Sequence, residues 1–264
     1  LSSSSAASDV YKRQILDSGM LEQLTEEAWY SPFPQFQTTE RPDRAAQELL
    51  NGKAVLLCDN SPVALVVPGA FNSFMESSED WYNRFEMASF LRVLRYLAMA
   101  VATLLPGLYL AVIRFHTQIL PANLILSFAQ AREGVPFSSV VELVFLELSF
   151  ELIREAGVRI PGALGNAIGI VGGLIIGQAA VEANLVSPVV VIIVALTALG
   201  SLAIPNEEFA SAFRLLKYAF LFLGGFLGIF GIVLGLYLTM AHLAGLLSFG
   251  VPYLCLLYTS PSPR

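Results

Sequence analysis

The chain has 264 residues, of which 55% are hydrophobic and only 14% are charged, and its mean hydropathy is +0.66. An ordinary soluble domain carries about 25% charged residues, and a net charge of −6 argues against nucleic acid as a partner, because phosphate binding calls for a basic surface. The two cysteines, Cys58 and Cys255, lie in no CxxC motif and beside no histidine, so we expect two unpaired thiols.

Charge is distributed unevenly along the chain. Residues 15–95 hold 12 acids and 6 bases, whereas residues 96–254 hold 8 acids and 6 bases over a much longer stretch with long uncharged runs. This division predicts a short soluble part, residues 15–92, followed by a helical membrane domain, residues 93–254.

Both termini differ in composition from their neighbours. Residues 1–14 and 255–264 are rich in serine and proline and break the adjoining patterns. We expect both to be artefact tails of adaptor or vector origin, and we expect the natural protein to be longer at both ends.

The soluble part begins with two helical segments. Residues 15–28 form an amphipathic helix candidate, and the prolines of SPFP (31–34) then enforce an extended connector. Pro42 opens a second helix, which Asn51-Gly52 ends.

A β-hairpin is predicted next. AVLLC (54–58) and VALVV (63–67) are apolar runs joined by the turn DNSP. Because both arms are almost wholly apolar, we expect the sheet to be covered on both faces. Residues 15–92 are therefore interpreted as part of a small α/β domain.

A helix that begins near Ser78 leads into the first apolar run. Arg84, Arg92 and Arg95 precede that run, so the positive-inside rule places the N-terminal domain in the cytoplasm. Four runs are expected to be membrane spans. They are residues 96–113, 160–181, 187–204 and 215–240.

Three of these runs carry local signals. The first contains Pro106-Gly107, where we expect a kink. The third has Ser187 as N-cap and Pro188 at the first helical position, and Pro205 ends it. The second contains the glycine pattern considered below.

Residues 115–159 are harder to assign, because they hold eight charged residues among apolar ones. The stretch is either a fifth span that faces a protein or water interior, or amphipathic helices in the interface. The predicted fold is a polytopic α-helical membrane protein with four spans plus one or two further segments, preceded by part of a small cytoplasmic α/β domain. The span count and the side of the C-terminus stay open.

Residues 165–178, GNAIGIVGGLIIGQ, carry a glycine at every fourth position. These are Gly165, Gly169, Gly173 and Gly177. A helix stripe without side chains lets another backbone approach closely, so we expect it to be a helix-packing face. The functional interpretation adds that the helices slide or tilt on this face during gating. The last span has a matching set, Gly224, Gly228, Gly231 and Gly235.

The opposite side of that helix carries Val171, Ile175, Gln178 and Glu182. We hypothesise that these four residues line a pore. In a ring of subunits, branched apolar side chains can gate by dewetting, and carboxylates attract cations. The alternative is that the apolar pair faces lipid and the polar pair lies at the interface.

Three carboxylates, Glu147, Glu151 and Glu155, share one helix face. They indicate either a cation-attracting vestibule or a salt-bridged interfacial face, with Arg154 and Arg159 within reach.

The sequence contains no recognisable catalytic motif. His116 and His242 are isolated, and the chain has no HExxH, GxSxG or Walker sequence. We therefore predict no catalytic, cofactor-binding or metal-binding residues and no enzymatic activity.

Five segments, in order over residues 15–254, resemble the A subunit of spore germination receptors of the GerA type. They are WYSPFPQFQTTERPD, LPGLYLAVIRFHTQILP, AREGVPF, FELIREAGVRIPGALGNAIGIVGGLIIGQAAVEANLVSP and SFGVPYL. Much of the family's N-terminal domain and the tail after Leu254 are absent, and a paralogue of the A subunit in another sporulation operon fits the pattern equally.

The resemblance implies a location in the inner membrane of bacterial endospores, with a cytoplasmic N-terminal domain. It implies a transporter-like B subunit and a lipoprotein C subunit as partners, and self-association as a ring around a nutrient-gated monovalent cation path that triggers germination. A secondary transporter and a non-conducting membrane scaffold are the alternatives, although no second half repeats the first as in many transporters. Which nutrient is sensed, the ion selectivity and the subunit number stay open.

Overall fold

The computed structural model describes residues 17–59, 61–158 and 163–254, without the side chains of residues 158, 163–171 and 174. The chain divides into two compact units. Unit 1 joins residues up to Ser89 with residues from Thr239 onward, and unit 2 runs from Phe90 to Leu238. The predicted tails lie outside the described residues.

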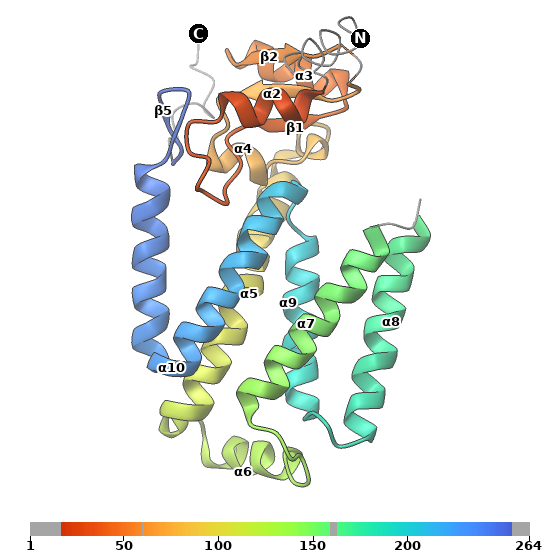
Figure 1. The fold of residues 1–264 in the computed structure, drawn as a ribbon, viewed down its shortest axis with the longest axis vertical. Coiled ribbons are helices and arrows are strands. Elements are labelled where there is room, and N and C mark those ends of the chain that lie inside the picture. Colours follow the sequence, from red (N-terminus) through yellow and green to blue (C-terminus); the bar gives the residue numbers. More distant parts are fainter. Residues whose placement is uncertain (1–16, 60, 159–162, 255–264) are drawn as a thin grey trace, which may run out of the picture. The chain divides into compact units, whose positions relative to one another are not determined.

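Unit 1 contains a three-stranded antiparallel sheet in the order β1-β3-β2. Its elements are α2 (Ser18–Thr25), β1 (Gln37–Thr39), α3 (Pro42–Leu50), β2 (Ala54–Leu57), β3 (Ala64–Val67) and α4 (Phe71–Met75) (Figure 1). The predicted hairpin is confirmed as β2 and β3, with Ala54 opposite Val67. The predicted helix that opens at Pro42 is confirmed as α3, since proline at the first helical position lacks only an N–H that would have no partner there.

Two features of this sheet differ from the expectation. Residues 37–39, for which no strand was expected, pair with β3 as the third strand. β3 is buried along its whole length, but Leu57 of the edge strand β2 is 80% exposed. Covering on both faces is therefore wrong for β2, whose end residues Ala54 and Leu57 are both exposed.

The helix expected from Ser78 into the first apolar run is interrupted. Residues Ser78–Trp81 form the short 3-10 helix η1, and α5 (Phe85–Phe115) begins only afterwards. The Asp80 carboxylate accepts a hydrogen bond of 3.2 Å from the Ser77 backbone N–H. Such local hydrogen bonds between side chain and backbone compete with the regular helical pattern, so residues 78–81 form a separate short turn of helix.

The segment after the last helix folds as a small hairpin within unit 1. Its strands are β4 (Leu247–Ser248) and β5 (Val251–Pro252). The turn residues Phe249 and Gly250 have φ values of +50° and +74°, the positive values that a type I′ turn needs. The Ser248 hydroxyl donates to the Gln35 carbonyl at 2.9 Å and accepts from the Gly69 N–H at 3.0 Å.

Tyr253 completes this attachment. Its hydroxyl donates to the Pro34 carbonyl at 3.0 Å, and its ring stacks on Phe74 with centroids 5.9 Å apart. The segment 239–254, which the sequence analysis placed in the membrane domain, thus groups with the N-terminal domain, because its hydrogen bonds and aromatic contacts lie there.

Unit 2 is helical in its described part, and α5 and α10 each begin or end in unit 1. Its helices are α5, η2 (Thr117–Ile119), α6 (Ala122–Ala131), α7 (Ser139–Val158), α8 (Ala163–Glu182), α9 (Pro188–Leu202) and α10 (Glu207–Gly245). α7 packs against both α8 and α9 (Figure 1). The core gathers Leu143 and Leu146 of α7, Val190 and Val194 of α9, and Leu221 of α10.

Two helices of the described chain, α5 and α10, are long and apolar enough to cross a membrane, judged by length and composition. α8 occupies the second expected span. α9 occupies the third with 15 residues, or about 23 Å, which is shorter than the hydrocarbon core of about 30 Å. Four spans therefore stay a prediction.

α10 is not the single span expected over residues 215–240. Gly228, with φ +66° and ψ −147°, interrupts the helix and divides it into the arms 207–227 and 229–245. Figure 1 shows that the two arms run in opposite directions. The expectation missed this reversal because the run is uniformly apolar, and only the left-handed backbone of one glycine marks the turn.

Close backbone contacts stabilise this reversal. A Cβ on Gly235 of the second arm would lie 2.8 Å from the Phe220 ring of the first arm. Arg114 of α5 donates a hydrogen bond of 2.8 Å to the Gly225 carbonyl, near the end of the first arm. A cation there also interacts favourably with the negative end of the helix dipole.

Candidate functional site

A buried ion pair connects three helices of unit 2. The Lys217 ammonium of α10 lies 2.5 Å from Oε2 of Glu147 of α7, and these side chains are 8% and 2% exposed. The Thr197 hydroxyl of α9 lies 3.0 Å from the other carboxylate oxygen, Oε1, and shares its single proton between that oxygen and the Val194 carbonyl at 2.8 Å. Both oxygens of Glu147 therefore have partners, which a buried carboxylate requires.

Two further polar contacts continue from this pair along the same helices. Arg154 donates to the Ser201 hydroxyl at 2.8 Å, and Arg214 lies 3.3 Å from the carboxylate of Glu151. The Glu151 and Arg214 side chains are 36% and 26% exposed, so the cluster runs from a buried end to a half-exposed end. We call these residues the polar seam: Glu147, Glu151, Arg154, Thr197, Ser201, Arg214 and Lys217.

Helical spacing explains why the seam forms. Its members recur on each helix three or four residues apart, and residues at that spacing lie on one helix face. Each of α7, α9 and α10 therefore presents a polar stripe to the other two within an otherwise apolar bundle.

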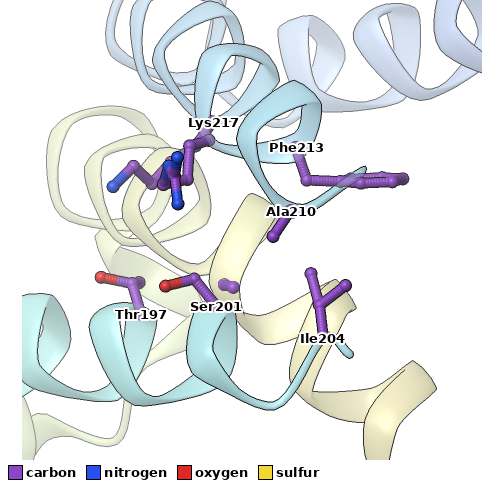
Figure 2. Close-up of a pocket in the computed structure, with 8 residues that line it drawn as sticks. Thr197, Ser201, Ile204, Ala210, Phe213 and Lys217 are labelled. Atoms are coloured by element: carbon purple, nitrogen blue, oxygen red, sulfur yellow. The ribbon is translucent and has the colours of Figure 1, made fainter. Parts of the chain in front are cut away.

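A small cavity lies beside the buried end of the seam (Figure 2). It has a volume of about 10 Å³, which is room for roughly one water molecule. Its lining is Ala102, Thr197, Ser201, Ile204, Ala210, Phe213, Arg214 and Lys217. Figure 2 shows the hydroxyls of Thr197 and Ser201 on the side where Lys217 lies, with Ile204 and Phe213 at the other end.

A second buried carboxylate, Glu142 of α7, connects Arg132 to the start of α9. Its Oε1 accepts from Arg132 at 2.9 Å, and its Oε2 accepts from the backbone N–H of Ser187 at 3.0 Å. Ser187 stands at the N-cap of α9, as predicted, but its side chain makes no capping hydrogen bond. The carboxylate of another helix thus binds this N-terminus, where negative charge is favoured.

The predicted pore face lies on α8. Ile175 is 61% exposed, and Gln178 and Glu182 are exposed and joined by a hydrogen bond of 3.1 Å from Nε2 of Gln178. The side chain of Val171 is outside the described part of the chain. The pore role of these four residues stays a prediction.

The glycine stripe of α8 faces its neighbours at the two described positions. A Cβ on Gly173 would lie 2.6 Å from the Phe150 ring of α7, and one on Gly177 would lie 3.1 Å from Val191 of α9. The surroundings of Gly165 and Gly169 are outside the described part. These distances accord with a packing role, which stays a prediction for the stripe as a whole.

The three predicted vestibule carboxylates have different environments. Glu147 is buried and paired with Lys217, whereas Glu151 pairs with Arg214 rather than with Arg154. Glu155 is exposed. Sequence reasoning placed the three on one face but missed the partners Thr197 and Lys217, which lie 50 and 70 residues away along the chain.

The described residues contain no group of three or more His, Cys, Asp or Glu side chains that could hold a metal ion. The seam also contains no nucleophile beside a general base in the sense of a catalytic triad. Its chemistry is that of paired charges and hydroxyls, which position helices.

Comparison with known proteins identifies the relationship. Residues 7–262 match the family described as Bacillus/Clostridium GerA spore germination protein. The match reaches into both terminal segments that the sequence analysis set aside. No solved structure matches the chain.

Three relatives from Bacillus subtilis (strain 168) illustrate the similarity. Spore germination protein KA is 44% identical over 91% of this chain and 44% of its own length, and spore germination protein A1 is 42% identical over 93% and 51%. The uncharacterized membrane protein YfkQ is 47% identical over 91% and 47%. The chain spans about half the length of these relatives. With a family match over nearly all of its residues, the chain belongs to the GerA spore germination protein family.

Proposed function

We propose that this chain is part of the A subunit of a nutrient germinant receptor in the inner membrane of bacterial endospores. The observation that carries the proposal is the family match over residues 7–262, with relatives named as spore germination proteins. The apolar helices α5 and α10 support a membrane location. The positive-inside rule supports a cytoplasmic N-terminal domain.

Within that receptor, the subunit self-associates as a ring and lines a path for monovalent cations. The exposed side of α8, with Ile175, Gln178 and Glu182, supports this role, because polar and apolar side chains there are not buried within the single chain. Val171 is assigned to the same face from helical spacing. Apolar rings can close such a path by dewetting.

A transporter-like B subunit, which binds the nutrient, and a lipoprotein C subunit complete the receptor in this proposal. Nutrient binding on the partner shifts the ring from a closed to an open population. Both partners follow from the family resemblance. A conducting subunit and a non-conducting scaffold differ in the ion flux that they support.

The decisive experiment reconstitutes the full-length receptor with its partner subunits in liposomes and measures Rb⁺ flux before and after nutrient addition. A channel is supported if the Rb⁺ flux rises after nutrient addition and does not saturate as the concentration of Rb⁺ or of any exchanged solute increases. Flux that requires a counter-transported solute favours a secondary transporter. Assembly with no flux in either condition favours a scaffold.

A cysteine-accessibility scan of residues 165–182 tests the pore face. We expect thiol reagents to label positions 171, 175, 178 and 182 in the open receptor and to spare the glycine stripe. Labelling along the glycine stripe with silence at the other four positions would reverse the assignment. Val171→Ala should raise the cation leak of spores, and an unchanged leak and nutrient response would contradict the pore role.

A further inference from the structure

The buried pair Glu147–Lys217 is costly for an apolar helical unit. At 2% and 8% exposure, both charged side chains have lost nearly all contact with solvent. Replacing such a pair with apolar side chains is often neutral or stabilising, whereas removing one partner is strongly destabilising. Stability alone therefore gives no reason for the pair, and charged residues within membrane helices commonly mark functional positions.

The pair connects its helices away from their ends. Counted from the first residue of each helix, Glu147 is the ninth of 20 residues in α7 and Lys217 the eleventh of 39 in α10, within the first arm. Thr197 is the tenth of 15 residues in α9. The three side chains thus join the first arm of α10 to both α7 and α9 at one point.

The same face of this arm carries a glycine contact about two turns after Lys217. Gly224 packs directly on the backbone of Gly107 of α5, with no side chain between the two helices. Helix faces without side chains let two backbones approach closely. The first arm is therefore held by a polar contact at Lys217 and, on the same face, by a glycine contact at Gly224.

The cavity gives the ammonium an alternative position. Lys217 lines it together with the hydroxyls of Thr197 and Ser201. A water molecule there could solvate the ammonium when it leaves the carboxylate, since a cavity of about 10 Å³ is close to the minimum for one water. The ammonium then has two positions, one at the carboxylate of Glu147 and one at the cavity beside the hydroxyls of Thr197 and Ser201.

We propose that Glu147, Thr197 and Lys217 form an interlock that holds the helical unit in its non-conducting arrangement. The ammonium of Lys217 leaves the carboxylate of Glu147 when the cation path opens. This inference rests on the proposed channel function and names part of its regulation. The three residues are positioning residues, because they act through the placement of α10.

The test uses two variants of the full-length receptor in spores. Glu147→Gln/Lys217→Met removes both buried charges together, and Thr197→Val removes one hydroxyl with little change of shape. Both variants should accumulate, because the double variant holds no buried charge at this site and Thr197→Val keeps the Glu147–Lys217 pair and loses one hydrogen bond to Oε1. We expect nutrient-independent K⁺ release to rise about tenfold in the double variant and less in Thr197→Val, as for a coupling of ordinary size.

Unit 1 offers a matched control. Lys53 and Glu48 form another buried pair, 2.9 Å apart, with side chains 3% and 9% exposed. Glu48→Gln/Lys53→Met makes the same chemical change outside the helical unit. We expect it to leave nutrient-independent release unchanged.

The interlock would be overturned if both seam variants accumulate normally and release K⁺ without nutrient at the wild-type rate. If the double variant does not accumulate, Thr197→Val alone decides by the same criterion. Equal leakage of the Lys53 control would also overturn it, because loss of any buried pair would then open the receptor. A wild-type receptor that never conducts Rb⁺ in liposomes would instead defeat the channel function itself.

Discussion

Gly224 and Gly225 are neighbours in α10, yet their surroundings differ. A Cβ on Gly224 would collide with the backbone of Gly107, which cannot give way as a flexible side chain can. A Cβ on Gly225 would lie 3.5 Å from a methyl group of Leu110, an ordinary contact distance. The two positions allow the packing role of one glycine to be separated from glycine's low helix propensity.

We therefore predict that Gly224→Ala lowers the stability of the full-length protein by about 1–3 kcal/mol, the usual cost of overpacking. Gly225→Ala should be neutral or raise stability by up to about 1 kcal/mol, the helix propensity difference. Thermal unfolding of the purified protein in detergent measures both. Equal effects of the two substitutions would contradict the close approach of α5 and α10.

Tyr253 is fully buried, and burial raises the pKa of its phenol above the usual range. A group whose folded-state pKa is raised contributes stability that is complete below its unfolded pKa, about 10, and that is lost as pH rises further. We expect the melting temperature of the full-length protein to decline above about pH 10.

Tyr253→Phe is the control for this decline. It loses the hydrogen bond to the Pro34 carbonyl, which costs about 1 kcal/mol at neutral pH. Because phenylalanine does not titrate, the variant should show a shallower decline between about pH 9 and pH 11. Parallel pH profiles for the two proteins would show that Tyr253 is not the group concerned.

At the scale of elements, the reversal of α10 depends on one glycine. The φ of +66° and ψ of −147° at Gly228 lie in a region that side chains rarely adopt. A Cβ there would also lie 3.2 Å from the Phe115 ring. The backbone conformation therefore requires glycine, and a Cβ would in addition need the Phe115 ring to shift by a few tenths of an ångström.

Gly228→Ala should cost about 1–3 kcal/mol and reduce the accumulation of the protein in membranes. Gly245→Ala, at the end of the same element, is the control, because a Cβ there would meet no atom within 4 Å. Thermal unfolding and immunoblots of membranes measure the two variants. Equal stability of the Gly228→Ala and Gly245→Ala proteins would contradict the left-handed backbone conformation at Gly228 and hence the reversal of α10.

At the scale of the whole molecule, unit 1 constrains the membrane topology. The hairpin of β4 and β5 is hydrogen-bonded to Gln35 and Gly69 of the N-terminal domain. Two segments in one compact unit lie on the same side of a membrane, so the chain between them crosses it an even number of times. In the proposed topology that side is the cytoplasm, which the positive-inside rule favours.

An impermeant thiol reagent tests this topology. Both variants of the full-length protein carry Cys255→Ser. The first keeps Cys58 as the probe, and the second carries Cys58→Ser and Leu247→Cys. We expect both cysteines to be labelled from the cytoplasmic side. Both positions have accessible side chains, with Leu247 46% exposed. Labelling of the two cysteines from opposite sides would require an odd number of crossings.

The sequence by itself determined what depends on local composition. The α/β character of residues 15–92, the hairpin of β2 and β3 and the start of α3 at Pro42 follow from alternation, turn residues and the fixed φ of proline. Apolar runs and the order of the family segments likewise indicated a membrane protein of the GerA family, which the family match confirms.

Only the tertiary structure decided which distant residues meet. Glu147 could be placed on a helix face from its spacing, but its partner Lys217 lies 70 residues away, and no local pattern specifies that pairing. The sequence analysis grouped Gly228 with the packing glycines of the last span, but in the structure its backbone conformation reverses the chain. Helical periodicity fixes the face of a residue, while the neighbour opposite that face and the sign of a glycine's φ are set by how the whole chain packs.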